Sequence, residues 1–284
     1  MTSDAGILFL RETEKRVGIL HRLANVIHDR RHPSYVKHEI HQMLIQRVNQ
    51  IALGYEDAND CDSLRSDPVF KLSCDELPLS GMSLASQSTM SRFENSCSRT
   101  TLYRMSQAFL EAFIDSYAEP PEGIIIDFDD TVDPTHGAQQ MSIFNSYHNT
   151  TCYMPLHVYE GQSGKLITTI LRPGKRPSGM ENYIKEHKLH LFSGRTSCHT
   201  FEANQFRLFL HSAAYFLLQA FRRIHLKYTE FFNAQFDTIR LKLLKIGAQV
   251  RELKTRVKIH LPSSFPLHNV FITIWKSCCI SGYT

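Results

Sequence analysis

Residues 123–131 read Gly-Ile-Ile-Ile-Asp-Phe-Asp-Asp-Thr. Three consecutive isoleucines that run into clustered carboxylates predict a buried strand that carries acids to the edge of a sheet. Side chains alternate along a strand, so Asp127 and Asp129 should share one face, with Ile126 and Phe128 on the other. Two convergent carboxylates suit a hard divalent cation such as Mg²⁺, which takes oxygen ligands and keeps several waters. A strand end followed by an Asp-rich turn is the plain alternative.

Length and composition describe an ordinary globular protein. The chain has 284 residues, 42% of them hydrophobic, enough for one sizeable core or two smaller ones. No run of 18 apolar residues occurs, and the start of the chain is too short and, at Asp4, too acidic for a signal peptide. We therefore expect a cytoplasmic protein without a membrane contact. The seven cysteines include no C-x-x-C pair, which predicts reduced, structural thiols.

Charge is segregated along the chain, although the formal net charge is only +4. Residues 51–150 hold sixteen Asp and Glu against five Lys and Arg, whereas residues 201–284 hold twelve Lys and Arg against four acids. A basic part beside an acidic part suits a protein that grips phosphates with one and a metal with the other. Solvated helix faces are the commoner origin of such charge runs.

Apolar spacing outlines a chain that is helical up to Pro120 and mixed afterwards. Helices are expected at 38–53 and 101–117, where apolar residues recur at helical spacing. Three strands should follow at 123–128, 151–159 and 165–171, the last two joined by a turn at 160–164. From residue 180 the pattern becomes helical again. A long apolar helix is expected at 203–223, and a regular basic one over 239–257.

Three longer stretches carry a resemblance to a known family. Residues 51–60 read Ile-Ala-Leu-Gly-Tyr-Glu-Asp-Ala-Asn-Asp, residues 126–131 read Ile-Asp-Phe-Asp-Asp-Thr, and residues 195–207 read Arg-Thr-Ser-Cys-His-Thr-Phe-Glu-Ala-Asn-Gln-Phe-Arg. In these stretches, and in shorter ones up to residue 264, the chain resembles the DDE transposases of bacterial insertion sequences. The resemblance covers nearly the whole chain.

The resemblance implies an α/β fold with a ribonuclease-H-like (retroviral-integrase-like) core flanked by helical regions. We expect a helical N-terminal region over 1–120 that could contact DNA, the catalytic core over 121–228, and a basic C-terminal helical region over 229–284. The implied partner is DNA, both the transposon ends and the target, which makes the protein nucleoid-associated. A homo-oligomer is left open.

The resemblance also implies the site residues. The family's first catalytic carboxylate maps to Asp129, followed by Thr131, with Asp127 as the fallback. Its helical glutamate maps to Glu181, with Lys188 seven positions on and hence on the same helix face. Asp129 and Glu181 would be catalytic and, with Asp127, would bind Mg²⁺ or Mn²⁺, while the residues expected to contact DNA are Lys185, Lys188 and Arg195. Taken alone, a Glu and a Lys on one helix are usually a solvated pair.

The chain departs from the family's pattern around residues 174–180. The family has a Tyr seven positions and an Arg four positions before the catalytic Glu, but this chain has Gly174 and Pro177 there. No Asp occurs between residues 134 and 236, so the strand that bears the second catalytic Asp is missing. Another departure from the family's pattern is Gly194, since an Asp is expected before Arg195. We infer an internal deletion that joins Gly179 to Met180, an incomplete core, and little or no strand transfer.

Two other functions remain open on the same residues. Asp127-x-Asp129-x-Thr131 after an apolar strand also matches the first motif of haloacid-dehalogenase-like phosphatases, in which the first Asp attacks phosphate and the second handles the leaving-group proton. That motif normally has Gly where Asp130 stands. The other possibility is a non-catalytic DNA-binding remnant that retains basic surfaces without the chemistry.

Overall fold

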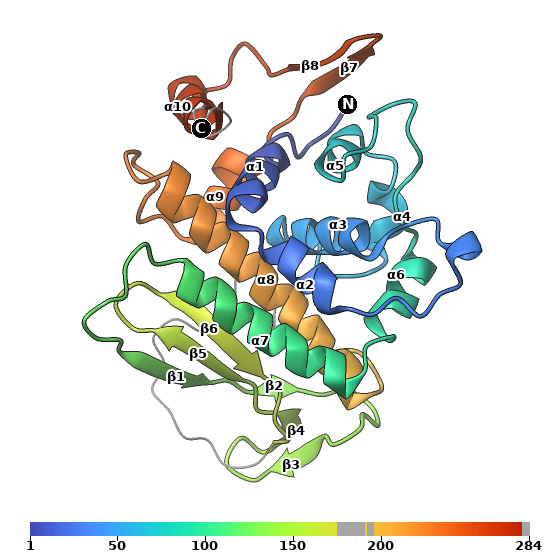
Figure 1. The fold of residues 1–284 in the computed structure, drawn as a ribbon, viewed down its shortest axis with the longest axis vertical. Coiled ribbons are helices and arrows are strands. Elements are labelled where there is room, and N and C mark those ends of the chain that lie inside the picture. The colour runs from blue at the N-terminus through green and yellow to red at the C-terminus, as the bar shows by residue number, and fades with distance from the viewer. Residues whose placement is uncertain (175–190, 192–195, 280–284) are drawn as a thin grey trace.

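The computed structural model describes residues 1–174, 191 and 196–279. Within them the chain is a mixed α/β structure, with most helices in one part and the strands β1 to β6 in another (Figure 1). The helices are α1 Ile7–Val17, α2 Ile19–Val26, η1 Pro33–Tyr35, α3 Ile40–Ala52, α4 Asp60–Leu64, α5 Pro68–Ser73, α6 Gln87–Glu94, α7 Arg99–Asp115, α8 Phe201–His225, α9 Phe236–Ile239, the π-helix η3 Arg240–Leu244, and α10 His268–Cys279. The strands are β1 Ile126–Asp130, β2 Asp133–Pro134, β3 Ile143–Asn145, β4 Thr150–Tyr153, β5 Leu156–Glu160, β6 Lys165–Ile170, β7 Gln249–Leu253 and β8 Arg256–His260.

The N-terminal helices begin and end at residues suited to the purpose. Gly18 ends α1 with a left-handed φ of 64°, which glycine adopts without a steric penalty, and α2 starts at the next residue. Glu14 then caps α2, because its Oε1 accepts hydrogen bonds from the backbone N–H groups of Leu20 and His21 at 2.8 and 3.2 Å. Ser98 caps α7 through the N–H of Thr101. The helices expected at 38–53 and 101–117 are thus confirmed as α3 and α7.

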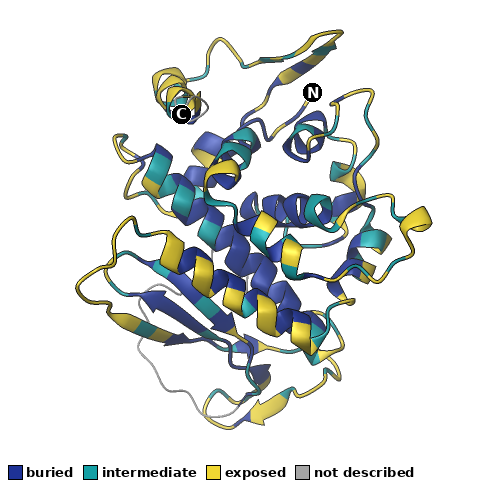
Figure 2. Cartoon of the chain, viewed as in Figure 1, coloured by how far each residue is buried: buried dark blue, intermediate teal, exposed yellow. Residues whose placement is uncertain are grey.

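Helix α8, 25 residues long, is the centre of the molecule. It packs against α1 and α3 on the N-terminal side and against α7 and β6 on the sheet side. Figure 2 shows that it is mostly buried between the two parts, with partly exposed residues toward one end. One continuous hydrophobic core runs from Ile7 to Cys278 and includes most of its apolar side chains. The helix expected at 203–223 is confirmed, and it joins the N-terminal helices to the sheet.

The strands form two small antiparallel sheets and a hairpin. One sheet has the order β1-β5-β6, the second the order β2-β4-β3, and β7 pairs with β8. Strand β6 matches the strand expected at 165–171, and the turn at 160–164 is closed by Gly164 N–H donating to the Glu160 carbonyl at 2.8 Å. The strand expected at 151–159 is wrong as a single element. It divides before Pro155, which has no N–H for a ladder, into β4 and β5 of different sheets.

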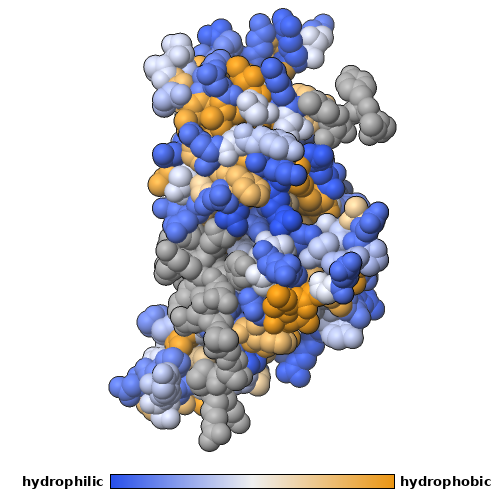
Figure 3. Space-filling model, turned by 90° about the vertical axis from the view of Figure 1, so that its left-hand side faces the viewer, coloured by the Kyte–Doolittle hydropathy of each residue, from blue (hydrophilic) through white to orange (hydrophobic). Residues whose placement is uncertain are grey.

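The isoleucine run is not buried, which corrects the first expectation. Ile124, Ile125 and Ile126 are 46%, 53% and 51% exposed, and Phe128 is 50% exposed. The strand itself begins only at Ile126, and among the described residues β1 pairs with β5 alone, so it lies at the edge of its sheet. An apolar sequence predicts a strand but does not fix its place in the sheet. Figure 3 looks at the molecule from the β1 side and shows apolar side chains at the surface.

The long basic helix expected over 239–257 is also wrong. Helix α9 runs into η3, whose last residue is Leu244, and the chain then forms the β7–β8 hairpin. Val250 is buried, and Val257 and Ile259 are partly buried against the core, with polar residues between them. This alternation is that of a strand, although the same residues also fall at spacings of three and four. The region 229–284 is therefore not helical throughout.

Two further expectations from the sequence concern the state of the cysteines and membrane-spanning helices. All seven cysteines are free thiols, which agrees with the absence of a disulfide framework. Among the described residues, no helix has both the length and the apolar character needed to cross a bilayer.

Candidate functional site

Strand β1 presents its acids as the alternation predicted. Asp127 lies opposite Tyr159 and Asp129 opposite His157 in the antiparallel pairing with β5, so the two carboxylates share one face of the sheet. Asp129 is completely buried, whereas Ile126 and Phe128 on the other face are half exposed. Asp127 and Asp129 thus share one face, and Asp129 is the buried residue of the two.

His157 is the cross-strand neighbour of Asp129 and is also completely buried. Its Nδ1 lies 3.0 Å from the hydroxyl of Thr169 on β6, which also accepts a hydrogen bond from Ser212 of α8 at 3.0 Å. Burial lowers the pKa of His157 to about 3, so its ring is neutral at physiological pH. His157 therefore adds a polar group but no positive charge beside Asp129. The sequence did not single it out, because its position depends on the strand register.

Asp130 points to the face opposite Asp129 and is held by Arg172. The Arg172 guanidinium forms an ion pair with Asp130 and donates a second hydrogen bond, from Nε to the Met154 carbonyl at 3.0 Å. This contact joins the end of β1 to the segment after β6. Asp130 is thus engaged in a structural contact. Arg172 and Asp130 are far apart in the sequence, so only the fold reveals that they pair.

Asp133 follows the same strand and starts β2. It is completely buried and accepts a hydrogen bond from the Thr196 hydroxyl at 2.6 Å. Thr196 belongs to the segment that leads into α8, so this bond ties the second sheet to that segment. Asp133 lies just past the end of β1, and its strand β2 belongs to the other small sheet.

The described residues alone give an incomplete set of metal ligands. They contain no group of three or more His, Cys, Asp or Glu side chains placed to hold a metal ion. Asp127 and Asp129 are oxygen donors on one face and so could supply two ligands of the kind that Mg²⁺ or Mn²⁺ takes. The third expected ligand, Glu181, and the expected DNA contacts Lys185, Lys188 and Arg195 lie outside the described residues.

Gly174 occupies a position without room for a side chain. A Cβ there would lie 2.5 Å from the carbonyl oxygen of Cys152 and 2.7 Å from that of Ile143, both backbone atoms. The Gly174 carbonyl accepts a hydrogen bond from the Asn145 side chain at 3.1 Å. The segment at Gly174 therefore packs along β4 and β3, and the tyrosine that the family places seven residues before its catalytic Glu has no space here.

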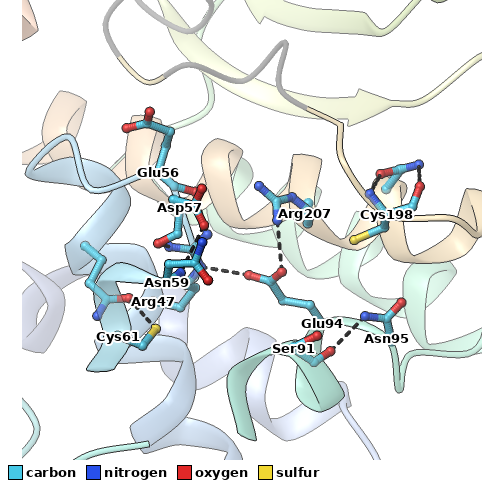
Figure 4. Close-up of polar contacts among 12 residues, drawn as sticks. Arg47, Glu56, Asp57, Asn59, Cys61, Ser91, Glu94, Asn95, Cys198 and Arg207 are labelled. Atoms are coloured by element: carbon cyan, nitrogen blue, oxygen red, sulfur yellow. Dashed lines mark hydrogen bonds and ion pairs between the residues drawn. The ribbon is translucent and has the colours of Figure 1, made fainter. Parts of the chain in front are cut away.

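A second buried polar cluster joins two of the stretches that resemble the family (Figure 4). Glu94 of α6 accepts hydrogen bonds from Arg47 Nε of α3 at 2.7 Å and from an Arg207 amino group of α8 at 3.1 Å. The Arg47 guanidinium also donates to the backbone carbonyls of residues 55–57. Residues 51–60 and 195–207 thus meet through this cluster. The signal in the sequence was Arg47, which has the only Lys, Arg, Asp or Glu side chain of α3.

Comparison with known proteins gives one family. The model of the transposase DDE domain, group 1, matches residues 1–180 and 178–278. No curated protein and no solved structure is similar enough to this chain to count as a match.

Proposed function

Because the chain belongs to the group 1 DDE transposases, we propose that it is an insertion-sequence transposase whose core has lost the segment with its second catalytic aspartate. The family acts on DNA. The protein retains DNA binding, and its ability to cut and join DNA is lost or nearly so.

The break in the family match carries this proposal. The match falls into two stretches that meet at residues 178–180, where the sequence passes from Gly179 to Met180. An intact core would place further chain between these two stretches. The tight packing of Gly174 along β4 supports the same conclusion, because it leaves no room for the tyrosine that the family has seven positions before its catalytic Glu.

The exposed side of β1 gives independent support. In a ribonuclease-H-like core the first strand is internal, with the strand of the second aspartate beside it. Within the described residues β1 is an edge strand, and Ile126 and Phe128 are half exposed beside that edge. Removal of an internal strand leaves an unpaired edge and an uncovered apolar face of this kind.

The remaining residues define what the site could do. Asp129 and Glu181, with Asp127 as the fallback, would hold Mg²⁺ or Mn²⁺, which would stabilise the attacking and departing oxygens of a phosphoryl transfer. Lys185, Lys188 and Arg195 would contact DNA phosphates. Asp129 is buried, so its carboxylate is held in one orientation by the fold. Without the second aspartate the metal clamp lacks a ligand, which is why we expect little or no strand transfer.

The strand directions favour this function over a haloacid-dehalogenase-like phosphatase. Such an enzyme needs its nucleophile on a doubly wound, mainly parallel sheet. Strand β1 pairs antiparallel with β5, and β5 antiparallel with β6. Three strands that pair antiparallel in this order support the ribonuclease-H-like core that we propose.

The test is a cleavage and joining assay with the purified protein. The substrate is duplex DNA from the flanks of the gene, with Mg²⁺ or Mn²⁺, and an undeleted relative serves as positive control. We expect DNA binding that weakens as salt rises, no cleavage or joining, and unchanged binding by Asp129→Ala. Metal-dependent cleavage by this protein that Asp129→Asn abolishes would overturn the proposed defect.

A further inference from the structure

A cavity of about 680 Å³ opens far from β1 in sequence, between the segment of residues 28–40 and helix α6. The segment includes the short helix η1 and in Figure 1 forms the blue loop beside α6, at the right of the view. Its tip carries Tyr35, which is 82% exposed. Neither the sequence motifs nor the proposed core assigns a role to this cleft.

The walls of the cleft are strongly basic. Five cationic side chains and one acid line it, namely Arg30, Arg31, Lys37, Arg65, Arg92 and Asp29. The acid is already paired, because the Arg31 guanidinium donates to both oxygens of Asp29 at 2.8 and 2.6 Å. The same guanidinium donates to the His38 carbonyl at 2.8 Å, so the pair also closes the loop. The Arg31 hydrogen bond holds the pKa of Asp29 below its usual value, which keeps this pair ionised.

The other four cations have no such partner. Arg30, Lys37, Arg65 and Arg92 form no ion pair with any acid of the described residues, and the Arg92 guanidinium donates only to the Thr89 hydroxyl, at 3.4 Å. The hydroxyl-bearing residues Ser86, Thr89 and Ser96 lie between them. A concave surface with four uncompensated cations and several hydroxyl groups is suited to an extended polyanion.

The position of two of these cations strengthens the argument. Residues 51–150 hold only five Lys and Arg against sixteen acids. Two of those five, Arg65 and Arg92, line the cleft together with the three cations of the 28–40 segment. The cleft therefore combines two of the few cations of this generally acidic stretch with three cations from a separate part of the chain. Solvated charges on a single helix face would not bring together cations from separate parts of the chain, as this cleft does.

We propose that this cleft binds the phosphate backbone of double-stranded DNA through residues other than Lys185, Lys188 and Arg195. The proposal rests on the proposed function, because it takes the duplex as the polyanion. Arg30, Lys37, Arg65 and Arg92 contact phosphates as fixed charges, and the Asp29–Arg31 pair keeps the loop in shape. Contacts of this kind hold DNA without reading its sequence.

The experiment measures duplex affinity over a series of salt concentrations, using the full chain and a fluorescent 30-base-pair DNA. The cleft variant replaces three exposed cations: Arg30→Ala, Lys37→Ala and Arg92→Ala. The control variant removes the same charge from exposed residues near the other end of α8 and beyond: Lys227→Ala, Lys242→Ala and Lys276→Ala. Each lost phosphate contact lowers the slope of log K against log salt by about 0.9, so the cleft variant should lose about 2.7. At about 150 mM salt, the loss of three phosphate contacts should lower the affinity of the cleft variant for DNA at least tenfold.

The outcomes separate this proposal from the function on which it rests. If the wild-type chain does not bind duplex DNA, the proposed function fails. If the wild-type binds and the cleft variant keeps the wild-type slope, or the control variant loses as much, the cleft assignment alone fails. Tighter binding of single-stranded RNA of the same length would also overturn the choice of DNA. The three single alanine variants, each checked by thermal unfolding, keep the test decisive if the triple variant folds poorly.

Discussion

Glu94 joins three helices, α3, α6 and α8. It is 2% exposed and accepts charged hydrogen bonds from two buried arginines, Arg47 and Arg207. Truncation of such a group leaves both guanidinium groups buried without their counter-charge. We therefore expect Glu94→Ala to lower the free energy of unfolding by about 3–5 kcal/mol in urea denaturation. Glu111→Ala, at an exposed position of α7, should change it by less than about 0.5 kcal/mol, and an equal effect of the two would contradict this account.

Glu14 makes stability depend on pH. Burial raises its pKa to about 7, since its Oε2 is buried and has no hydrogen-bond partner among the described residues. The folded protein then holds this proton up to about pH 7, whereas the unfolded chain releases it near the ordinary pKa of 4.5, so stability falls as pH rises between these values.

Glu14→Gln keeps an oxygen to cap α2 and cannot titrate. Between pH 4.5 and 7.5 the wild-type should lose roughly 2–3 kcal/mol of unfolding free energy relative to this variant. Urea denaturation of both proteins at several pH values measures the difference. The buried histidines His157 and His211 are present in both proteins, so their contribution to the pH dependence of stability cancels. Parallel pH curves for the two proteins would refute the assignment.

At the scale of elements, the β7–β8 hairpin is docked through Glu252. Its carboxylate accepts hydrogen bonds from the backbone N–H groups of Leu79 and Ser80 at 2.8 and 3.1 Å and from the Ser80 hydroxyl. Glu252→Ala should therefore speed amide hydrogen exchange both in residues 249–260 and around residue 80. Lys254→Ala, at an exposed position of the same hairpin, is the matched control. Faster exchange in the hairpin without any change near residue 80 would contradict this docking contact.

Sequence patterns predicted elements where local spacing and long-range packing agree. Helices α3, α7 and α8 have one apolar period over more than ten residues, and β6 lies between clear turn signals, so all four were found. The hairpin was missed because Val250, Leu253 and Val257 satisfy helical spacing, and only tertiary contacts select the strand. Likewise alternation put Asp127 and Asp129 on one face, but no local pattern could reveal the edge position of β1, the approach of His157 or the partner of Asp130.

At the scale of the whole molecule, the exposed side of β1 governs association. Ile126 and Phe128 are half exposed on a strand that pairs on one edge only within the described residues. Such an edge is a template for pairing with another chain. The double variant Ile126→Lys and Phe128→Lys should reduce concentration-dependent association in analytical ultracentrifugation and leave the unfolding temperature within a few degrees, since little burial is lost. Leu241→Lys, at an apolar residue 59% exposed elsewhere, is the control. Equal association of all three proteins would refute this role for β1.

The first residues of the chain are fastened to a segment near its end. Thr2 and Ala248 exchange two backbone hydrogen bonds of 3.0 Å, and the N–H groups of Ala5 and Gly6 donate to the carbonyls of Ile246 and Leu244. A ribosome that adds about 5–20 residues per second delivers those partners roughly ten to fifty seconds after the opening segment has emerged. Throughout that interval the residues before α1 lack the backbone hydrogen-bond partners that they have in the folded protein. Translation arrest before residue 244 would therefore leave an apolar leading segment open to chaperones and proteases.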